Sequence, residues 1–222
     1  MSAPLPGVEI DARGAPAGTV LWLHGLGASG HDFEPIVPLL NLPHVRFVFP
    51  HAPARPVTIN GGLVMPAWYD IRVMSAAGGE DADSVRESAT LVEAWIAREK
   101  ALGIGSDRVV LAGFSQGGAM ALFVGVRHPQ PLRGIMVLSG YEVVAQTREA
   151  ETSDENRATP LLFGHGTYDP MVNVARARAA FAAYATPGRD AAWREFPMAH
   201  EVCPEEIVWI REWLSARFPT PA

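Results

Sequence analysis

The chain has 222 residues, of which 48% are hydrophobic, and a formal net charge of −6. This composition excludes a disordered chain, and the acidic balance argues against nucleic acid or an anionic membrane as the main partner. At about 100–200 residues per domain, and with no linker-like segment, we expect a single domain over residues 1–222.

Short apolar runs alternate with longer helical patterns along the chain. In chain order they predict a strand at 19–24, a short helix at 31–40, a strand at 45–49, an irregular loop over 51–80, a helix at 84–102, a strand at 108–112, a helix at 116–127, strands at 134–138 and 160–163, a helix at 172–184, a strand at 192–196 and a last helix from Pro204. This alternation predicts an α/β fold, a mostly parallel central sheet with helices on both faces.

Two of these helices carry signals at their ends. Ser84-Val-Arg-Glu87 fits a capping box at the start of the long helix, and Gly103 ends that helix. Pro204 opens the last helix and puts Glu205 and Glu206 in its first turn, where the helix dipole favours anions.

Gly113-Phe-Ser115-Gln-Gly117 matches the pattern G-x-S-x-G, and it lies between an expected strand and an expected helix. A nucleophile elbow needs this context, because its tight turn presents a serine at the carboxyl end of a strand. The alternative is a serine that merely caps the helix. Because the elbow's strained turn requires small neighbours, Gly113 and Gly117 favour Ser115 as a nucleophile.

A serine hydroxyl is a weak nucleophile, so it needs a base and a carboxylate that orients the base. Elbow enzymes carry these groups in the order serine, acid, histidine. His200 follows the strand at 192–196 and therefore projects from a strand's carboxyl end. We assign it as the base and give His165, at the end of its own strand, a structural role.

The carboxylate is expected past a strand, between the serine and the base. Asp169 fits this position. Asp154 lies in a polar, solvated stretch, and Asp190 precedes its strand, at the wrong end of the sheet. We therefore predict Asp169 as the third member of the triad.

Acyl transfer also needs N–H donors for the developing oxyanion. We expect them to be the backbone N–H groups of Gln116 and Leu26, the second in the glycine-rich loop after the first strand. Residues 25–30 also match G-x-G-x-x-G, a dinucleotide pattern, but no carboxylate follows at 47–53. The histidines lack a ligand spacing, and Cys203 stands alone as a packed cysteine, so we expect neither a metal nor a cofactor.

Six longer stretches of the sequence also indicate a serine hydrolase. They are Leu23–Phe33, His51–Gly62, Met65–Ile71, Gly113–Ala119, His165–Pro170 and Pro197–Val202. Together they resemble the carboxylesterase and acyl-protein thioesterase family of small α/β-hydrolases, especially its bacterial carboxylesterases.

The resemblance implies an α/β-hydrolase fold without a large cap domain. It carries the triad onto Ser115, Asp169 and His200, and the oxyanion donors onto Leu26 and Gln116. It also implies that the loop around 63–74 edges an acyl-binding groove lined by Leu63, Val64, Met65 and Trp68. The chain departs from the family at Ala199, where glycine is usual, and at Asn173, where proline is usual. Because alanine tolerates positive φ poorly, we expect a re-formed His200 loop.

We therefore expect a serine carboxylesterase that hydrolyses short- to medium-chain carboxylic esters through an acyl-enzyme on Ser115. An acyl-protein thioesterase or lysophospholipase would use the same triad. An alternative of another class is a non-catalytic hydrolase-fold protein that binds a small ligand. The start of the chain lacks signal-peptide features, so we expect a cytoplasmic protein with a small-molecule ester as partner, no nucleic acid and no stable membrane association. Family members are often dimers, which leaves a homodimer open.

Overall fold

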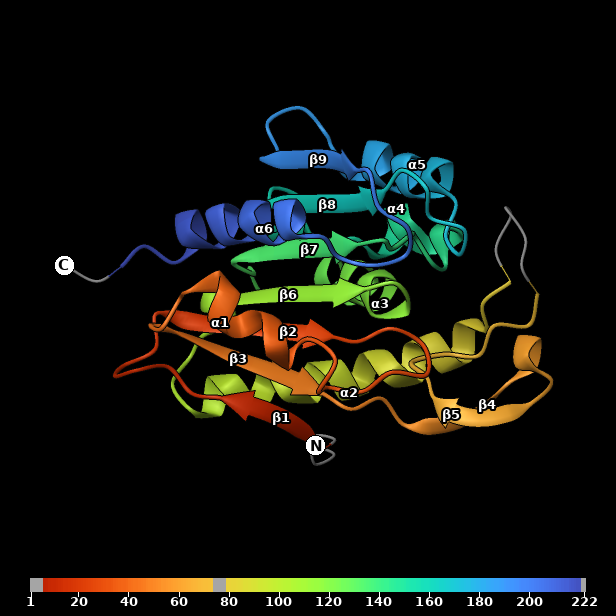
Figure 1. The fold of residues 1–222 in the computed structure, drawn as a ribbon, viewed down its shortest axis with the longest axis horizontal. Helices are drawn as coiled ribbons and strands as arrows, with labels where there is room; N and C mark the ends of the chain where they lie inside the picture. The colour runs from red at the N-terminus through yellow and green to blue at the C-terminus, as the bar shows by residue number, and fades with distance from the viewer. Residues whose placement is uncertain (1–5, 74–78, 221–222) are drawn as a thin grey trace.

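The computed structural model describes residues 6–73 and 79–220. Within them, seven strands form one sheet in the order β1-β3-β2-β6-β7-β8-β9 (Figure 1). Strand β1 runs antiparallel to β3, and every other neighbouring pair in this sheet is parallel. The mostly parallel α/β sheet predicted from the sequence is therefore confirmed.

The elements follow the predicted alternation. The strands are β1 (Gly7–Ile10), β2 (Gly18–Leu23), β3 (Val45–Pro50), β4 (Ala54–Val57), β5 (Leu63–Pro66), β6 (Val109–Phe114), β7 (Gly134–Leu138), β8 (Leu161–Gly166) and β9 (Ala191–Phe196). The α-helices are α1 (Val37–Leu40), α2 (Ala82–Ala101), α3 (Gln116–Gly125), α4 (Arg148–Glu151), α5 (Val174–Tyr184) and α6 (Pro204–Arg217).

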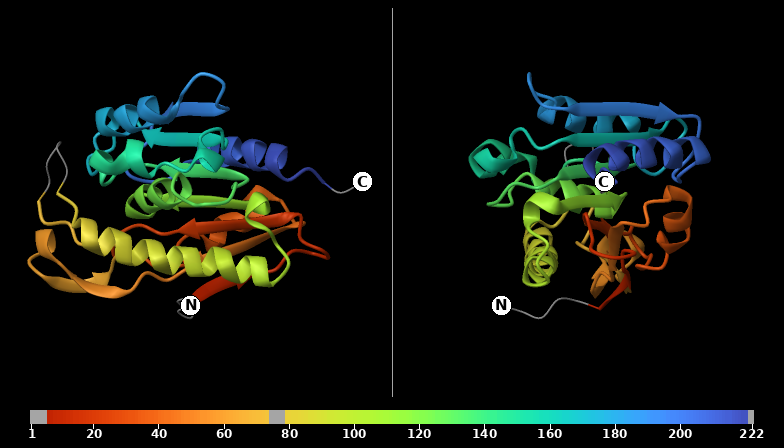
Figure 2. Two further views of the ribbon diagram at one scale, coloured as in Figure 1. Left: turned by 180° about the vertical axis from the view of Figure 1, so that it is seen from behind. Right: turned by 90° about the vertical axis from the view of Figure 1, so that its left-hand side faces the viewer.

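Helices cover both faces of the sheet, as the edge-on view in Figure 2 shows. Apolar side chains of α2, α3 and α5 pack on one face, and those of α1 and α6 pack on the other. The central strands β2, β6, β7 and β8 are buried on both faces, which explains their unbroken apolar sequences. This rigid core fixes the loops at the carboxyl ends of the strands, where parallel α/β sheets bind their ligands.

Two groups of strands differ from the sequence prediction. The four-residue strand β1 was not predicted; it is half-buried at the edge of the sheet and has too few residues to show an alternation. The expected irregular loop over 51–80 contains the antiparallel hairpin β4–β5, which stands apart from the main sheet (Figure 1). Prolines at both of its strands conceal the hairpin, because proline usually argues against a strand.

The long helix also begins earlier than predicted. Its N-cap is Asp81, whose side chain accepts a hydrogen bond from the Ser84 backbone N–H. The Ser84 hydroxyl instead donates to the Asp81 carbonyl and accepts from the backbone N–H of Asp70. The predicted capping box at Ser84–Glu87 is therefore wrong, because Ser84 lies inside the first turn. None of the described helices is both long and apolar enough to cross a membrane.

Candidate active site

Ser115 lies in the turn between β6 and α3, in a strained backbone conformation with φ 55° and ψ −118°. The turn is held by the Ser115 N–H, which donates to the Leu138 carbonyl at 2.8 Å. Glycine is required on both sides of it. A Cβ atom at Gly113 would lie 2.2 Å from the Gly117 carbonyl oxygen, and one at Gly117 would lie 2.2 Å from that of Leu23. The local sequence thus permits a turn that few other residues would allow.

The structure brings the three predicted triad residues together from separate loops. His200 Nε2 lies 2.9 Å from Ser115 Oγ, and His200 Nδ1 lies 2.7 Å from Asp169 Oδ2. A carboxylate can only accept, so Nδ1 carries the hydrogen and donates to Asp169. Nε2 is then left to accept a hydrogen bond from the Ser115 hydroxyl, the arrangement that a general base needs.

Asp169 is fixed by the backbone that follows it. Its side chain is fully buried, and Oδ1 accepts hydrogen bonds from the N–H groups of Met171 and Val172, both at 2.8 Å. Oδ2 faces His200. The loop after β8 therefore holds one oxygen and offers the other to the imidazole.

His165 lies beneath this loop. It is fully buried, its Nε2 donates to the Val172 carbonyl at 2.9 Å, and the same nitrogen is 3.4 Å from Asp169 Oδ2. Burial lowers the pKa of His165, which favours its neutral form. These contacts hold the loop that carries Asp169 in place, and we propose a structural role for His165.

The residue before His200 needs no left-handed backbone. Ala199 is not among the described non-glycine residues with positive φ, so alanine is accommodated there without that strain, and the re-formed His200 loop stays a prediction. Glycine is needed instead at Gly166, where a Cβ atom would lie 2.1 Å from the Ala199 carbonyl oxygen. Asn173 caps α5 and accepts a hydrogen bond from the Ala175 N–H at 2.8 Å. Asparagine here therefore gives α5 a side-chain cap at its start.

The two predicted oxyanion donors lie beside the serine, in the loop after β2 and at the first residue of α3. Gly27 shapes this loop with φ +75°, and its N–H donates to the Pro66 carbonyl at 2.8 Å. His24 braces the same loop. Its Nδ1 donates to the Gly25 carbonyl at 2.7 Å and its Nε2 accepts from the Ala52 N–H at 3.0 Å, which sets a single neutral tautomer. Burial lowers the pKa of His24 and favours this neutral state.

Gln116 ties the elbow to the segment after β5. Its side-chain oxygen accepts from the Trp68 N–H at 2.7 Å, and its amide group donates to the Tyr69 carbonyl at 2.8 Å. The Trp68 indole N–H donates to the His24 carbonyl at 2.9 Å. Sequence reasoning missed these bracing roles of His24, Trp68 and the Gln116 side chain, because no motif joins residues so far apart.

Ser115 and His200 open into a cavity of about 1280 Å³. Of the four predicted substrate-binding residues, only Met65 lines it. Leu63 and Val64 point into solvent from the hairpin, 63% and 62% exposed, and do not line the cavity. Trp68 is completely buried behind the oxyanion loop. The prediction is therefore wrong for these three residues. The directions of Leu63 and Val64 depend on how an isolated hairpin packs, and Trp68, which follows the hairpin, is buried against Gln116 and His24.

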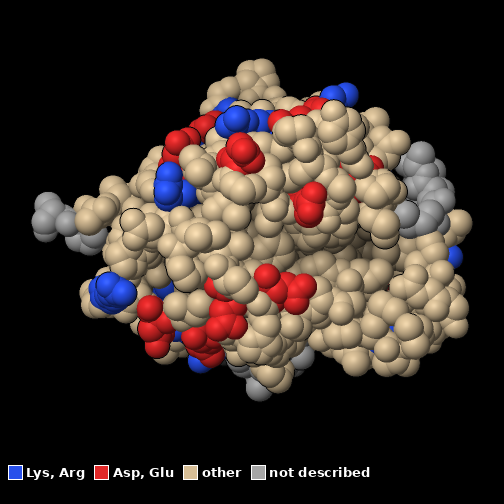
Figure 3. Space-filling view, in the orientation of Figure 1, with Lys and Arg blue, Asp and Glu red and all other residues tan. Residues whose placement is uncertain are grey.

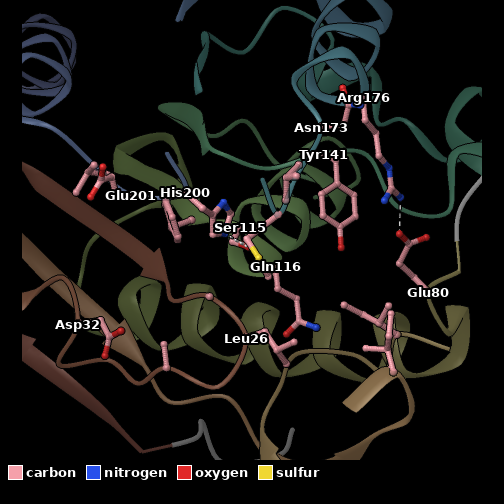
Figure 4. Close-up of a pocket in the computed structure, with 18 of the residues that line it drawn as sticks. Leu26, Asp32, Glu80, Ser115, Gln116, Tyr141, Asn173, Arg176, His200 and Glu201 are labelled. Carbon is pink, nitrogen blue, oxygen red and sulfur yellow. Dashed lines mark hydrogen bonds and ion pairs between the residues drawn. The ribbon is translucent and has the colours of Figure 1, made fainter. Parts of the chain in front are cut away.

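The cavity extends to both sides of the serine (Figure 4). On the His200 side, Asp32 and Glu201 bring negative charge, and Phe33 and Phe114 bring apolar surface. Figure 3 shows the hollow across this face with acidic side chains on both of its sides. The other side carries Tyr141, Arg176 and Glu80 among mainly apolar residues.

The remaining candidates lie away from the serine or lack partners for chemistry. Asp154 is exposed, and Asp190 pairs with Arg217 at the far end of α6. Cys203 is half-buried before α6, and burial raises the pKa of its thiol, which disfavours the reactive thiolate. The described ranges contain no group of three or more His, Cys, Asp or Glu residues placed to hold a metal ion.

Comparison with known proteins adds independent information. The family model described as phospholipase/carboxylesterase matches residues 8–217. Acyl-protein thioesterase 1 of Gibberella zeae is 35% identical over 213 residues, 90% of this chain and 91% of the relative. The protein of that name from Schizosaccharomyces pombe is 39% identical over 173 residues, 78% of this chain and 77% of the relative.

Solved structures show the same likeness. Arabidopsis thaliana SOBER1 superposes with a TM-score of 0.84 at 33% identity, covering 90% of this chain and 98% of that one. Zea mays acyl-protein thioesterase 2 superposes with a TM-score of 0.85 at 28% identity, covering 96% and 99%.

Proposed function

The chain belongs to the phospholipase/carboxylesterase family, and from this premise we propose that it cleaves acyl esters and thioesters through an acyl-enzyme on Ser115. It is a hydrolase of ester or thioester bonds, as its relatives are. The observation that carries the proposal is the hydrogen-bonded series Ser115–His200–Asp169, at 2.9 and 2.7 Å, at the cavity.

In the first step, His200 Nε2 takes the hydroxyl proton while Ser115 Oγ forms a bond to the acyl carbonyl carbon. Asp169 keeps Nδ1 protonated and stabilises the imidazolium that forms. The tetrahedral intermediate then collapses. The bond to the leaving oxygen or sulfur breaks, and that atom receives the proton from His200, which leaves the acyl group on Ser115.

The backbone N–H groups of Leu26 and Gln116 receive the negative oxygen of the intermediate. Among the described residues, neither N–H has another acceptor, so both are available to a ligand. His24 and the Gln116 side chain hold the two donors in place before substrate binds, which is how preorganised donors lower a barrier. Water activated by His200 then releases the acid and restores Ser115.

Two substrate classes share this machinery. A short- to medium-chain carboxylic ester is the substrate that the sequence predicts, and the mainly apolar cavity supports an acyl chain there. An acyl-protein thioester is favoured by the names of the relatives. Turnover of one acyl group carried on an alcohol, a small thiol and a cysteine-containing peptide separates the two: a kcat/KM highest for the peptide thioester supports the second.

Replacement of the nucleophile tests the proposal. We expect Ser115→Ala to lower kcat for a butyryl ester by roughly 10⁴–10⁶-fold, because the triad acts as a unit. The matched control is Ser215→Ala, an exposed serine on α6. A fluorophosphonate probe is expected to label the wild-type and Ser215→Ala proteins once per chain and to spare Ser115→Ala. Ester turnover retained by Ser115→Ala would contradict the assignment of Ser115 as the nucleophile, whereas neither labelling nor ester turnover by the wild type would support the non-catalytic alternative.

A further inference from the structure

Glu80 and Arg176 form an ion pair that lines the cavity. Their side chains are only 7% and 25% exposed, so both charges are largely withdrawn from solvent. The Arg176 guanidinium carbon also lies 3.8 Å from the centre of the Tyr141 ring. Partly buried charges depend on such partners, because each one alone would carry a desolvation cost.

The pair joins two elements that border the cavity from different directions. Arg176 lies on α5, whereas Glu80 lies just before α2 and pairs through its backbone with Ile71. Tyr141, beneath the guanidinium, is fixed by a 2.8 Å hydrogen bond from the Tyr69 hydroxyl. Figure 4 shows the ion pair on the side of Tyr141 that faces away from His200.

The chemistry of the proposed reaction decides which substrate group reaches this end. His200 must protonate the leaving group, so the leaving group lies on the His200 side of Ser115. The acyl chain then extends to the other side, toward Tyr141. Apolar side chains line this acyl side: Ile59, Ile71, Val73, Ala175 and Ala179.

An alkyl chain that reaches the ion pair meets a change in environment. Methylene groups gain free energy against Ile71 and Val73, but they cannot replace the charged partner of either Glu80 or Arg176. To continue, the chain would have to separate two charges that are poorly exposed to water. We propose that the Glu80–Arg176 ion pair sets the upper limit of acyl-chain length in this enzyme, an inference that rests on the proposed function.

The test removes both charges together, because a single replacement would leave the other charge unpaired. In Glu80→Ala/Arg176→Ala, we expect kcat/KM for p-nitrophenyl esters longer than the wild-type limit to rise at least about tenfold relative to the butyryl ester. Each buried methylene contributes about 0.8 kcal/mol, or roughly fourfold, so two added methylenes suffice for this gain. The butyryl ester itself is expected to keep its kcat.

Two further variants distinguish a length limit from general damage. The charge-reversed Glu80→Arg/Arg176→Glu keeps an ion pair across the cavity and is expected to restore the wild-type length limit. Arg178→Gln/Glu195→Gln removes an ion pair between α5 and β9, one that does not line the cavity, and is expected to leave the length profile unchanged. Equal losses at all chain lengths in the double alanine variant, or a failure of charge reversal to restore the limit, would overturn the inference.

A binding measurement makes the result independent of turnover. In a Ser115→Ala background, calorimetry with straight-chain carboxylic acids reports how far an alkyl chain enters. The double alanine variant is expected to bind the longer acids more tightly, again by about tenfold, with little change for butyrate. A shift in binding without any ester turnover by the wild-type protein would refute the proposed function and keep the length limit. Ester turnover with an unchanged length profile would refute the length limit alone.

Discussion

Asp169 divides its two carboxylate oxygens between the backbone and the imidazole. Oδ1 is held by the N–H groups of Met171 and Val172, and Oδ2 accepts from His200. Two backbone donors therefore determine which oxygen faces the base. The orientation of His200 depends as much on this short loop as on the charge of the aspartate.

An asparagine at this position separates orientation from charge. In Asp169→Asn, the side-chain oxygen must keep accepting from the two backbone N–H groups, so the amide group faces His200. Nδ1 then has to accept, and Nε2 carries the hydrogen toward Ser115 and cannot take the serine proton. We expect kcat for a butyryl ester to fall by about 10⁴-fold at neutral pH with little change in Tm. A kcat near that of the wild type would contradict the assignment of Asp169.

The sequence predicts the triad residues and fails on most of the acyl-binding ones, for a physical reason. Ser115 and Asp169 follow the apolar strands β6 and β8, His200 follows the mixed strand β9, and parallel strands bring their carboxyl ends to one edge. The directions of Leu63 and Val64 depend on how one hairpin packs, and the burial of Trp68 depends on its contacts with Gln116 and His24. Arg176 cannot be predicted as a cavity residue until Glu80 is known to lie across the cavity, because an arginine on a helix is ordinarily solvated.

At the scale of elements, two neighbouring glutamates in the first turn of α6 lie in opposite environments, one exposed and one buried. Glu205 is exposed, and a hydrogen bond from the backbone lowers its pKa, as expected for an anion at a helix start. Glu206 instead faces the core against Gly164, and neither of its oxygens has a hydrogen-bond partner among the described residues. Burial raises the pKa of Glu206 to about 8. The expectation that the dipole favours an anion there is wrong for Glu206.

This burial has a consequence for stability. The folded pKa of Glu206 lies above its ordinary value of 4.5, so folding is favoured below that value, and this contribution is lost as the pH rises to about 8. Glu206→Gln cannot ionise. We expect the variant to gain a few kcal/mol over the wild type between pH 5 and pH 8, measured by urea unfolding. Parallel stability curves for the two proteins would contradict a buried neutral acid.

Some elements can be predicted from the sequence much better than others. The buried strands β2, β6, β7 and β8 are predicted well because both of their faces are covered and their composition is uniformly apolar. The edge strand β1 and the hairpin β4–β5 are missed, since pairing with a neighbour and not local composition makes them strands.

At the scale of the whole molecule, catalysis and a buried charge network occupy opposite ends of one sheet. At the amino end, the Thr19 hydroxyl donates to Glu99 at 2.6 Å, and Arg46 Nε donates to the same carboxylate at 3.1 Å. Glu99 is fully buried and Arg46 nearly so. The network joins α2 to β2 and β3, far from the carboxyl ends where Ser115 and His200 lie.

This separation predicts that stability and activity respond independently. Arg46→Met leaves Glu99 buried without its nearer cation, with only Arg98 at 3.9 Å, and we expect it to cost about 3–5 kcal/mol of unfolding free energy. We expect kcat for a butyryl ester to stay unchanged at temperatures where the variant is folded. Arg157→Met, which removes a surface pair with Asp154, is the matched control and is expected to cost less than about 1 kcal/mol. A large loss of kcat in folded Arg46→Met would show that the two ends are coupled.

The fold class and the family were predicted from the sequence, and both are confirmed. Strand–helix alternation leaves few arrangements open to a mostly parallel sheet. The shape of the cavity was not predictable in the same way, because residues from the hairpin, α5 and the loop after β9 meet only once the sheet has assembled.

The left-handed backbone at Ser115 restricts which amino acids can ever occupy that position. Threonine carries the same hydroxyl, but its branched Cβ is poorly tolerated at positive φ. Cysteine has an unbranched Cβ like that of serine and keeps a nucleophile there. The turn thus limits the evolutionary routes away from serine by shape alone, before any demand of reactivity applies, and a change to thiol chemistry is the route that it leaves accessible.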